Sequence, residues 1–276
     1  MKPLIKWVGG KRRFIKYIEE EIPDNINNYF EPFAGSAALY FHLKIKNSNI
    51  NDLNTSLIDF YKTVRDNPEK LLDEINKTFN NSNPQQHYYD LRMQYNEEKK
   101  HLDKIRRSAL FFYLNKVGFN GIYRVNLQGN FNVPIGKSKT YFIPTKNDFN
   151  EASKLLKSTK LTSKDYKEIV RKAGFNDLIY LDPPYYPDDS SKFVGYTEPS
   201  FGKKQHEELI EECYKAWKKG CTILISNSNS LEFREKINYR FGESVICKNI
   251  FTKRSINPNS IDKKRFVENL YIIKQR

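Results

Sequence analysis

The sequence is poor in cysteine and has no long apolar run. Its three cysteines, Cys213, Cys221 and Cys247, form no CxxC pair, which argues against a zinc site and against a disulfide framework. Scattered thiols of this kind are typical of a reducing cytoplasm. No apolar run is long enough to span a bilayer, and the start MKPLIKWVGGKRR lacks the apolar segment of a signal peptide. These absences predict a soluble, cytoplasmic protein that needs no metal.

The composition indicates a folded, strongly basic chain. Of its 276 residues, 38% are hydrophobic and 14% aromatic, enough to form a sizeable core in one large domain or in a domain with an inserted unit. The net charge is +14, because 47 Lys and Arg face 33 Asp and Glu. This balance favours a polyanionic partner, nucleic acid first and an anionic membrane surface second. A general lysine bias of the genome is the alternative explanation.

Two apolar runs predict buried strands of an α/β sheet. Asp177–Leu181 (DLIYL) ends at a double proline, and Cys221–Ile225 (CTILI) ends at SNSNS. Near-continuous apolar runs suit strands that are buried on both faces of a sheet with parallel character. Lys203–Lys219 is predicted to be one of the helices between them. Alternating strands and helices predict a sheet with helices on both faces.

The middle of the chain has a different character. From about residue 59 to residue 143 it is rich in Lys, Arg, Asn, Tyr and Phe. Leu71–Phe79 and His101–Leu114 are predicted to be helical, whereas the glycines within Asn115–Gly136 predict a loop or a ribbon. We interpret this stretch, which combines positive charge with aromatic side chains, as a helical module inserted into the α/β sheet.

A glycine turn early in the chain predicts a nucleotide-type site. Phe33–Ala37 (FAGSA) approximates FxGxG at the end of a predicted strand, where Gly35 lets the backbone approach a ligand closely. Asp52 ends the next predicted strand, and its carboxylate can accept hydrogen bonds from both ribose hydroxyls. A dinucleotide is the rival ligand, but the turn lacks GxGxxG.

The segment KWVGGK, residues 6–11, is a second candidate binding element. Lys11 follows a Gly-Gly turn and can pair with a carboxylate, such as that of a methionine moiety. Trp7 offers its π-face to a cationic sulfonium. The alternative is an anchored N-terminal turn with a solvated lysine.

The most specific chemical motif is Asp182-Pro183-Pro184-Tyr185, directly after the strand DLIYL. An exocyclic amine of a base is a poor nucleophile, because its lone pair is delocalised into the ring. Two acceptors, the Asp182 carboxylate and the Pro183 carbonyl, can draw such an amine toward sp³ geometry, and Tyr185 can stack on the base. The base must first leave the duplex. Direct displacement then needs mainly positioning and no covalent intermediate.

The order of the motifs carries a resemblance to a known family. KWVGGK, FEPFAGSAAL, NDLN, NKVGFNGIYRVNLQGNFNVPIGK, YLDPPY, FVGYTEPSF, ILISNSN and KRSINPNSIDKKRFVENLYI follow one another along nearly the whole chain. In this order they resemble the Dam-family (D12-class, alpha-group) adenine-N6 DNA methyltransferases. The resemblance implies a Rossmann-like S-adenosylmethionine-dependent methyltransferase core, with a mixed, mostly parallel sheet flanked by helices. It also implies an inserted, mainly helical target-recognition domain over residues 57–146, so that residues 1–56 and 147–276 form the catalytic domain.

The resemblance further implies the residues of the active site. S-adenosylmethionine, which leaves as S-adenosylhomocysteine, would be bound by Trp7, Lys11, Phe33, Gly35, Asp52, Asp165 and Asp182. The target adenine would be held by Asp182, Pro183, Pro184 and Tyr185. The second glycine of the family's FxGxG is Ala37 in this chain, which predicts a slightly different turn.

For duplex DNA the resemblance implies roles in the inserted module. Phe119 would enter the base stack, Asn120 would meet the orphaned base, and Arg124 would read a guanine. The remaining predicted DNA contacts are Lys6 to the first guanine, Ile122 and Pro134 to a thymine methyl, Lys137 and Lys139 to phosphates, and also Asn126 and Asn132. Without the resemblance, Phe119 would be assigned to the module's core and Arg124 to its solvated surface. At positions 119 and 137, tyrosine and arginine also occur in the family.

Three functional hypotheses follow. The first is methylation of adenine N6 in duplex DNA by a monomeric, nucleoid-associated enzyme, at GATC or another GAT-containing site such as GATATC. The second is a different acceptor, namely cytosine N4, RNA adenine or a protein glutamine amide, of which the basic module disfavours the last. The third is a DNA-binding protein with a degenerate methyltransferase fold, which the intact Trp7, Lys11, Asp52 and DPPY disfavour.

Overall fold

The computed structural model describes residues 1–79, 84–98, 101–138, 140–187, 201–253 and 265–275. The chain divides into two compact units. Unit 1 contains Met1–Gly10, Ala34–Lys46 and Asp52–Ser163, and unit 2 contains Lys11–Phe33, Asn47–Asn51 and Lys164–Arg276. The boundaries of these units differ from the predicted division into a target-recognition domain, residues 57–146, and a catalytic domain, residues 1–56 and 147–276. That functional division stays a prediction.

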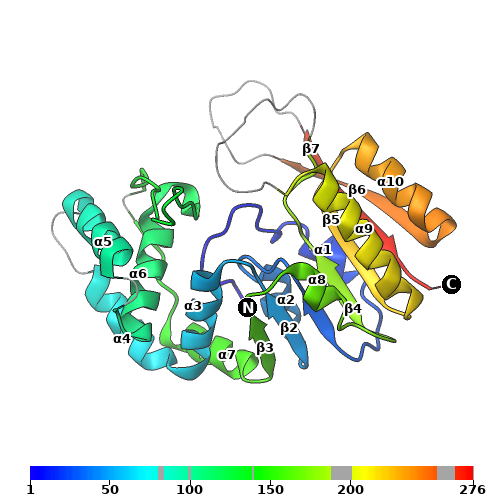
Figure 1. Cartoon of the computed structure of the whole chain (residues 1–276). Helices are drawn as coiled ribbons and strands as arrows, with labels where there is room; N and C mark the ends of the chain where they lie inside the picture. Colours follow the sequence, from blue (N-terminus) through cyan, green and yellow to red (C-terminus); the bar gives the residue numbers. More distant parts are fainter. Residues whose placement is uncertain (80–83, 99–100, 139, 188–200, 254–264, 276) are drawn as a thin grey trace. The chain divides into compact units, whose positions relative to one another are not determined.

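Unit 2 is built on a mixed, mostly parallel sheet (Figure 1). Its strands are β1 (Tyr29–Glu31), β2 (Ser48–Asn51), β4 (Leu178–Leu181), β5 (Thr222–Ser228), β6 (Val245–Lys253) and β7 (Arg265–Ile273). They lie in the order β2-β1-β4-β5-β7-β6. The first four strands in this order run parallel, and β7 is antiparallel to both of its neighbours. Every side chain of β4 is buried, as expected for a strand covered on both faces.

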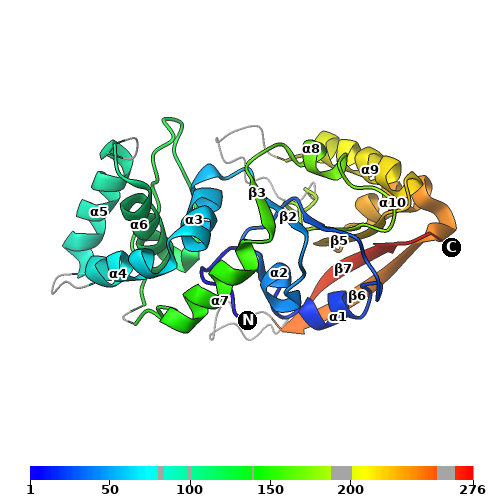
Figure 2. The ribbon, with the colours of Figure 1, turned by 90° about the horizontal axis from the view of Figure 1, so that it is seen from below.

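Helices cover both faces of this sheet. α8 (Tyr166–Val170), α9 (Lys203–Lys218) and α10 (Leu231–Phe241) lie on one face, and α1 (Ile15–Glu19) lies on the other (Figure 2). A 3₁₀ helix, η2 (Gly242–Ser244), follows α10. Alternate strand residues such as Ile179 and Leu181 pack against α8, α9 and α10 in one core, since successive side chains of a strand point to opposite faces. The predicted fold class is confirmed.

Unit 1 is mainly helical. It contains α2 (Ala38–Leu43), α3 (Thr55–Asp66), α4 (Pro68–Phe79), α5 (Pro84–Glu98), α6 (Lys104–Val117), the 3₁₀ helix η1 (Phe119–Gly121), α7 (Lys146–Leu156) and the strand β3 (Thr159–Thr162). Asn54 caps α3, and Thr145 and Asp148 form a capping box at the start of α7. Aromatic rings fill the space between α3 and α6, where Phe60 lies 5.9 Å from Phe112, ring centre to ring centre.

The start of α6 differs from the sequence-based expectation. The sequence predicts a helix from His101, but α6 begins at Lys104. The reason is local: the Asp103 carboxylate accepts hydrogen bonds from the backbone N–H of Ile105 and of Arg106, so that Asp103 caps the helix at this point. After α6, the expected loop carries two isolated bridges, between residues 118 and 135 and between residues 125 and 131.

The end of β5 also differs from the expectation. The sequence predicts that the strand stops at Ile225, whereas β5 continues to Ser228. Residues 226, 227 and 228 pair with residues 270, 269 and 268 of β7, which satisfies their backbone groups although their side chains are polar. This pairing brings Asn227 and Glu268, neither of which was predicted to be functional, into the end of the sheet that carries the DPPY motif.

Candidate active site and DNA-binding residues

The DPPY motif forms the loop that leaves the carboxyl end of β4. Two buried groups of unit 2 fix it: the Asn227 side chain accepts a hydrogen bond from the backbone N–H of Tyr186 at 2.9 Å, and His206 Nε2 lies 3.0 Å from the Pro184 carbonyl oxygen. Within the motif Pro183 is buried, while Asp182 and Tyr185 keep 21% and 40% of their side-chain surface exposed. The loop, held by these two contacts, therefore presents a carboxylate and an aromatic ring.

Lys11 joins this loop to β7. Its ammonium nitrogen lies 3.0 Å from an Asp182 carboxylate oxygen and 2.5 Å from a Glu268 carboxylate oxygen. It also donates a hydrogen bond of 3.2 Å to the Tyr185 hydroxyl and lies 4.9 Å from the centre of that ring. We call these four residues the Lys11 cluster. An ammonium group has three N–H donors, so a direct bond from Lys11 to a cofactor carboxylate would have to replace one of these three acceptors.

The electrostatics of the Lys11 cluster follow from two carboxylates sharing one buried cation. Burial lowers the pKa of Lys11, but the charges of Asp182 and Glu268 outweigh it and raise that pKa above its usual value. Burial raises the pKa of Asp182 to about 7, against the opposing charge of Lys11 and with a further contribution from Glu268. Burial also raises the pKa of Glu268, which Lys11 again opposes.

In unit 1 the predicted cofactor residues Trp7, Gly35 and Asp52 lie together. One Asp52 oxygen accepts the backbone N–H of Gly35 and the other accepts the backbone N–H of Asn54, each at 2.9 Å. Each carboxylate oxygen keeps a second lone pair for a further donor. Gly35 has φ +49°, and a Cβ placed on it would lie 2.5 Å from Trp7 Cδ1. The turn therefore has no room for a side chain beside the indole ring.

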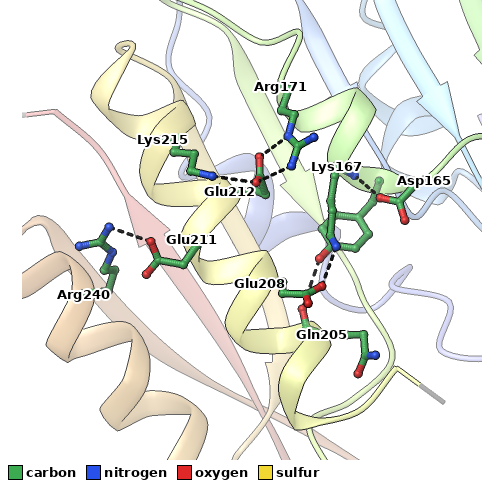
Figure 3. Close-up of polar contacts among 10 residues, drawn as sticks. Asp165, Lys167, Arg171, Gln205, Glu208, Glu211, Glu212, Lys215 and Arg240 are labelled. Atoms are coloured by element: carbon green, nitrogen blue, oxygen red, sulfur yellow. Dashed lines mark hydrogen bonds and ion pairs between the residues drawn. The ribbon is translucent and has the colours of Figure 1, made fainter. Parts of the chain in front are cut away.

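Unit 2 carries the other predicted cofactor residues, Phe33 and Asp165. The Phe33 ring stacks on Tyr166, with the ring centres 5.2 Å apart, and meets Phe201 edge-on. The Asp165 carboxylate accepts the backbone N–H of Lys167 at 2.8 Å and thereby caps α8 (Figure 3). This capping bond explains an acidic residue at position 165 without a ligand, and the predicted contact with the cofactor's adenine stays a prediction.

A groove of about 710 Å³ lies over α8, α9 and α10 of unit 2, and none of the predicted site residues lines it. Its charged side chains bind one another, as in the pairs Lys167–Glu208, Arg171–Glu212 and Arg240–Glu211 (Figure 3). Because these charged side chains already pair with one another between the helices, we do not assign a catalytic role to this groove.

The predicted first-guanine contact, Lys6, is tied to the loop after α6. The Asn115 side chain accepts the backbone N–H of Lys6 and donates to the carbonyl oxygens of Lys6 and Gly121. Gly121 has φ +68°, and a Cβ placed on it would lie 2.6 Å from Lys6 Cβ. Next to it, Phe119 is 41% exposed and Asn120 has φ +54°. The structure therefore brings Lys6, Phe119 and Asn120 into one surface region of unit 1.

The remaining predicted DNA contacts follow in the same loop. The guanidinium of Arg124 is held by Asn132, through Nε to the side-chain oxygen at 2.7 Å and Nη2 to the carbonyl at 3.3 Å. The Asn126 side chain closes the turn by accepting the N–H groups of residues 128 and 130. Pro134 and Lys137 are exposed, and Ile122 is half-buried. Lys139 lies outside the described residues.

Comparison with known sequences decides the family. A sequence model of the D12 class N6 adenine-specific DNA methyltransferases matches residues 7–251. The chain belongs to this family. The type II methyltransferase M.MjaIII of Methanocaldococcus jannaschii is 32% identical over 99% of this chain and 99% of its own length. The type II methyltransferase M1.LlaDCHI of Lactococcus lactis subsp. cremoris is 37% identical over 83% of this chain and 82% of its own. A DNA adenine methylase of Haemophilus influenzae is 30% identical over 94% of this chain and 88% of its own.

Family membership confirms the resemblance drawn from the motifs. The protein is an adenine-specific DNA methyltransferase. Within the described parts of the chain, no helix is long and apolar enough to cross a membrane. The same parts hold no group of three or more His, Cys, Asp or Glu side chains that is placed to bind a metal ion.

Sequence reasoning missed Glu268, Asn227 and His206. Glu268 left one signal, a single acidic residue within the apolar run FVENLYII, where an unpaired charge would be costly. Asn227 was hidden by the assumption that polar residues end a strand. His206 lies on α9 and shows no pattern of its own, because its contact with the Pro184 carbonyl joins residues far apart in the chain.

Proposed function

We propose that this methyltransferase moves the methyl group of S-adenosylmethionine to N6 of a flipped-out adenine in duplex DNA, at GATC or another GAT-containing site. The observation that carries this proposal is the Lys11 cluster. It holds an acceptor, Asp182, and a stacking ring, Tyr185, at the carboxyl end of a buried parallel strand. In open α/β sheets, ligands bind at the carboxyl ends of the strands.

The residues of both units suit S-adenosylmethionine in their chemistry. The Asp52 carboxylate keeps lone pairs that can accept hydrogen bonds from the ribose hydroxyls. Because Gly35 has no side chain, the ligand can contact both the backbone of the turn and the indole ring of Trp7. The predicted cofactor residues are Trp7, Gly35 and Asp52 in unit 1 and Lys11, Phe33, Asp165 and Asp182 in unit 2. When bound, the cofactor would supply an electrophilic methyl group and leave as S-adenosylhomocysteine.

Catalysis then depends on how the chain holds the target amine. The Asp182 carboxylate and the Pro183 carbonyl accept hydrogen bonds from the N6 hydrogens and draw the nitrogen lone pair out of the ring. Pro183 offers a carbonyl without a competing N–H. S-adenosylmethionine, when bound, would give its methyl group to N6, and Asp182, whose pKa is about 7, is suited to take the proton that N6 loses. Tyr185 stacks on the flipped base, while Pro184, bound by His206, fixes the loop.

Site recognition is assigned to the surface of unit 1. Phe119 enters the stack that the adenine has left, and Asn120 meets its former partner. Arg124 reads a guanine with a fork that Asn132 holds in place. The supporting contacts are Lys6 to the first guanine, Ile122 and Pro134 to a thymine methyl, Asn126 and Asn132 to DNA, and Lys137 and Lys139 to phosphates. We further propose that the enzyme acts as a monomer, associated with the nucleoid in the cytoplasm.

The test of this proposal is methyl transfer in vitro. Duplexes that contain GATC, GATATC or a scrambled site are incubated with enzyme and S-adenosylmethionine, and their nucleosides are analysed by mass spectrometry. We expect N6-methyladenine in a GAT-containing duplex only. N4-methylcytosine without N6-methyladenine, or equal methylation of the scrambled site, would refute the acceptor or the site. Failure to bind S-adenosylmethionine by calorimetry would refute the cofactor, and sedimentation checks the monomer.

A further inference from the structure

Glu268 is a buried acid that the proposed chemistry does not yet use. It lies on β7, opposite residue 228 of β5 and residue 250 of β6, with only 2% of its side chain exposed. Its carboxylate lies 2.5 Å from the ammonium of Lys11. A buried carboxylate destabilises the fold unless a cation such as Lys11 lies close enough to compensate its charge. The position of Lys11 therefore depends on Glu268.

We propose that Glu268 is a positioning residue of the methyl-transfer site: by binding Lys11 from the β7 side, it fixes the carboxylate of Asp182 and the ring of Tyr185 for the target adenine. This inference rests on the proposed function, because it assumes that Asp182 accepts the N6 amine. Glu268 itself does not touch the reacting atoms: it acts through Lys11 and through its own hydrogen bond with the Tyr185 side chain.

The geometry gives Glu268 two effects on Asp182. First, it takes one of the three donors of Lys11, so that the ammonium also bridges Asp182 and the Tyr185 hydroxyl instead of turning to either alone. Second, it divides the positive charge of Lys11 between two carboxylates. Asp182 is then only partly neutralised and stays a strong acceptor for an incoming N–H.

The charge of Glu268 also acts on the titration of Asp182. Together with burial it raises the pKa of Asp182, against the opposing effect of Lys11. Among the described residues, Lys11, Tyr185 and Tyr180 are further titratable groups that interact with the two carboxylates. The pKa of each of these three is raised, so they keep one protonation form between about pH 5.5 and pH 9. The two carboxylates share Lys11, so they titrate as a coupled pair in this range.

The experiment is Glu268→Gln, which keeps the shape and removes the charge. Activity and DNA affinity are measured between pH 5.5 and pH 9. We expect the acidic limb of the kcat profile to move to lower pH by about one unit, because the charge that raises the pKa of Asp182 is gone. We also expect kcat at pH 7.5 to fall about tenfold, with Kd for DNA unchanged, since the predicted DNA contacts belong to other residues.

The matched control is Glu212→Gln. Glu212 is also a buried, ion-paired carboxylate of unit 2, but it binds Arg171 and Lys215 and has no contact with Lys11 (Figure 3). This variant is expected to lose stability and to keep the position of the acidic limb. The proposal is overturned if Glu268→Gln leaves both kcat and the pH of the acidic limb of the kcat profile unchanged. It is also overturned if Glu268→Gln and Glu212→Gln shift that limb by the same amount.

A second variant covers a folding failure of Glu268→Gln. Glu268→Asp keeps the negative charge but places it one methylene group farther from Lys11. We therefore expect the acidic limb of the kcat profile to stay at the same pH while kcat falls. Wild-type kcat in this variant overturns the proposal, because the place of the carboxylate would then not matter. If the wild-type enzyme makes no N6-methyladenine at all, it is the proposed function that fails, and the two failures are thus distinguished.

Discussion

At the scale of single residues, the site is governed by the cost of burying charge. Asp182, in the loop after β4, and Glu268, on β7, are largely removed from water, and burial of this kind favours the protonated form of a carboxylate that has no partner. Lys11 keeps them ionisable near neutral pH, because it binds both. A carboxylate with a pKa of about 7 accepts hydrogen bonds when ionised and is a better base than an ordinary aspartate.

The first prediction concerns pH. Because Asp182 must be ionised to accept the amine, kcat/KM should rise as the pH increases through about 7 and should level off above it. Steady-state rates between pH 5.5 and pH 9 check this, with KM measured at each pH. A profile that is flat down to pH 5 would mean that the acceptor has an ordinary aspartate pKa or is a different group.

The second prediction concerns Asp182→Ala, which should abolish detectable turnover and leave the fold intact. The reason for the intact fold is that Lys11 keeps Glu268 as its counter-ion, so that no buried cation is left unpaired. Methyl transfer assays and thermal unfolding measure the two effects separately. A large drop in melting temperature would show that Asp182 is primarily a structural residue.

At the scale of elements, the turn between β1 and α2 decides how closely backbone and Trp7 approach each other. Gly35 and Ala37 share φ +49°. The alanine that replaces the second glycine of the family motif thus adopts the left-handed conformation in spite of its methyl group, at a cost of about 1–2 kcal/mol. What distinguishes Gly35 is therefore the clash with the indole ring rather than φ alone.

The third prediction follows from this difference. Gly35→Ala should destabilise unit 1 by more than the strain of a positive φ and should weaken S-adenosylmethionine binding at least about tenfold, because Trp7 must move. The control is Gly129→Ala: φ is +78° there, but no atom lies within 4 Å of the added Cβ. Calorimetry with the cofactor checks both variants, and equal losses in both would contradict the clash.

The fourth prediction concerns the loop after α6. Arg124→Ala should relax selectivity at one base pair, at a cost of about 1–3 kcal/mol, if the guanidinium that Asn132 holds reads one guanine as proposed. Lys137→Ala should instead weaken binding equally on all sequences, as expected for a phosphate contact. Affinities for a set of singly substituted duplexes measure the two patterns. Uniform weakening in Arg124→Ala would assign Arg124 to a phosphate.

The elements also show what the sequence can reveal. The apolar run DLIYL and the double proline after it place β4 and the DPPY loop correctly, because a strand buried on both faces has a local signature. The extension of β5 to Ser228 has no such signature, since it depends on the pairing with β7. The ion pair between Lys11 and Glu268 connects residues near opposite ends of the sequence. Only the order of the strands in the sheet brings them together, so no local pattern could predict it.

At the scale of the whole molecule, the positive charge and the family agree on a polyanionic substrate. The net charge of +14 attracts DNA irrespective of its sequence, whereas we propose that the choice of site depends on the loop after α6. The composition predicts the attraction to DNA, and the ordered motifs predict the methyltransferase family, which the comparisons confirm. The composition alone could not separate a DNA enzyme from a protein that only binds nucleic acid.

The most direct test of the central claim is to express the protein in a host that lacks adenine methylation and to sequence its genome with methylation-sensitive reads. Cells that express Asp182→Ala serve as the control. We predict N6-methyladenine at one short GAT-containing motif with the wild-type protein and none with the variant. A genome without new N6-methyladenine, or with methyl groups on cytosine only, would contradict the account.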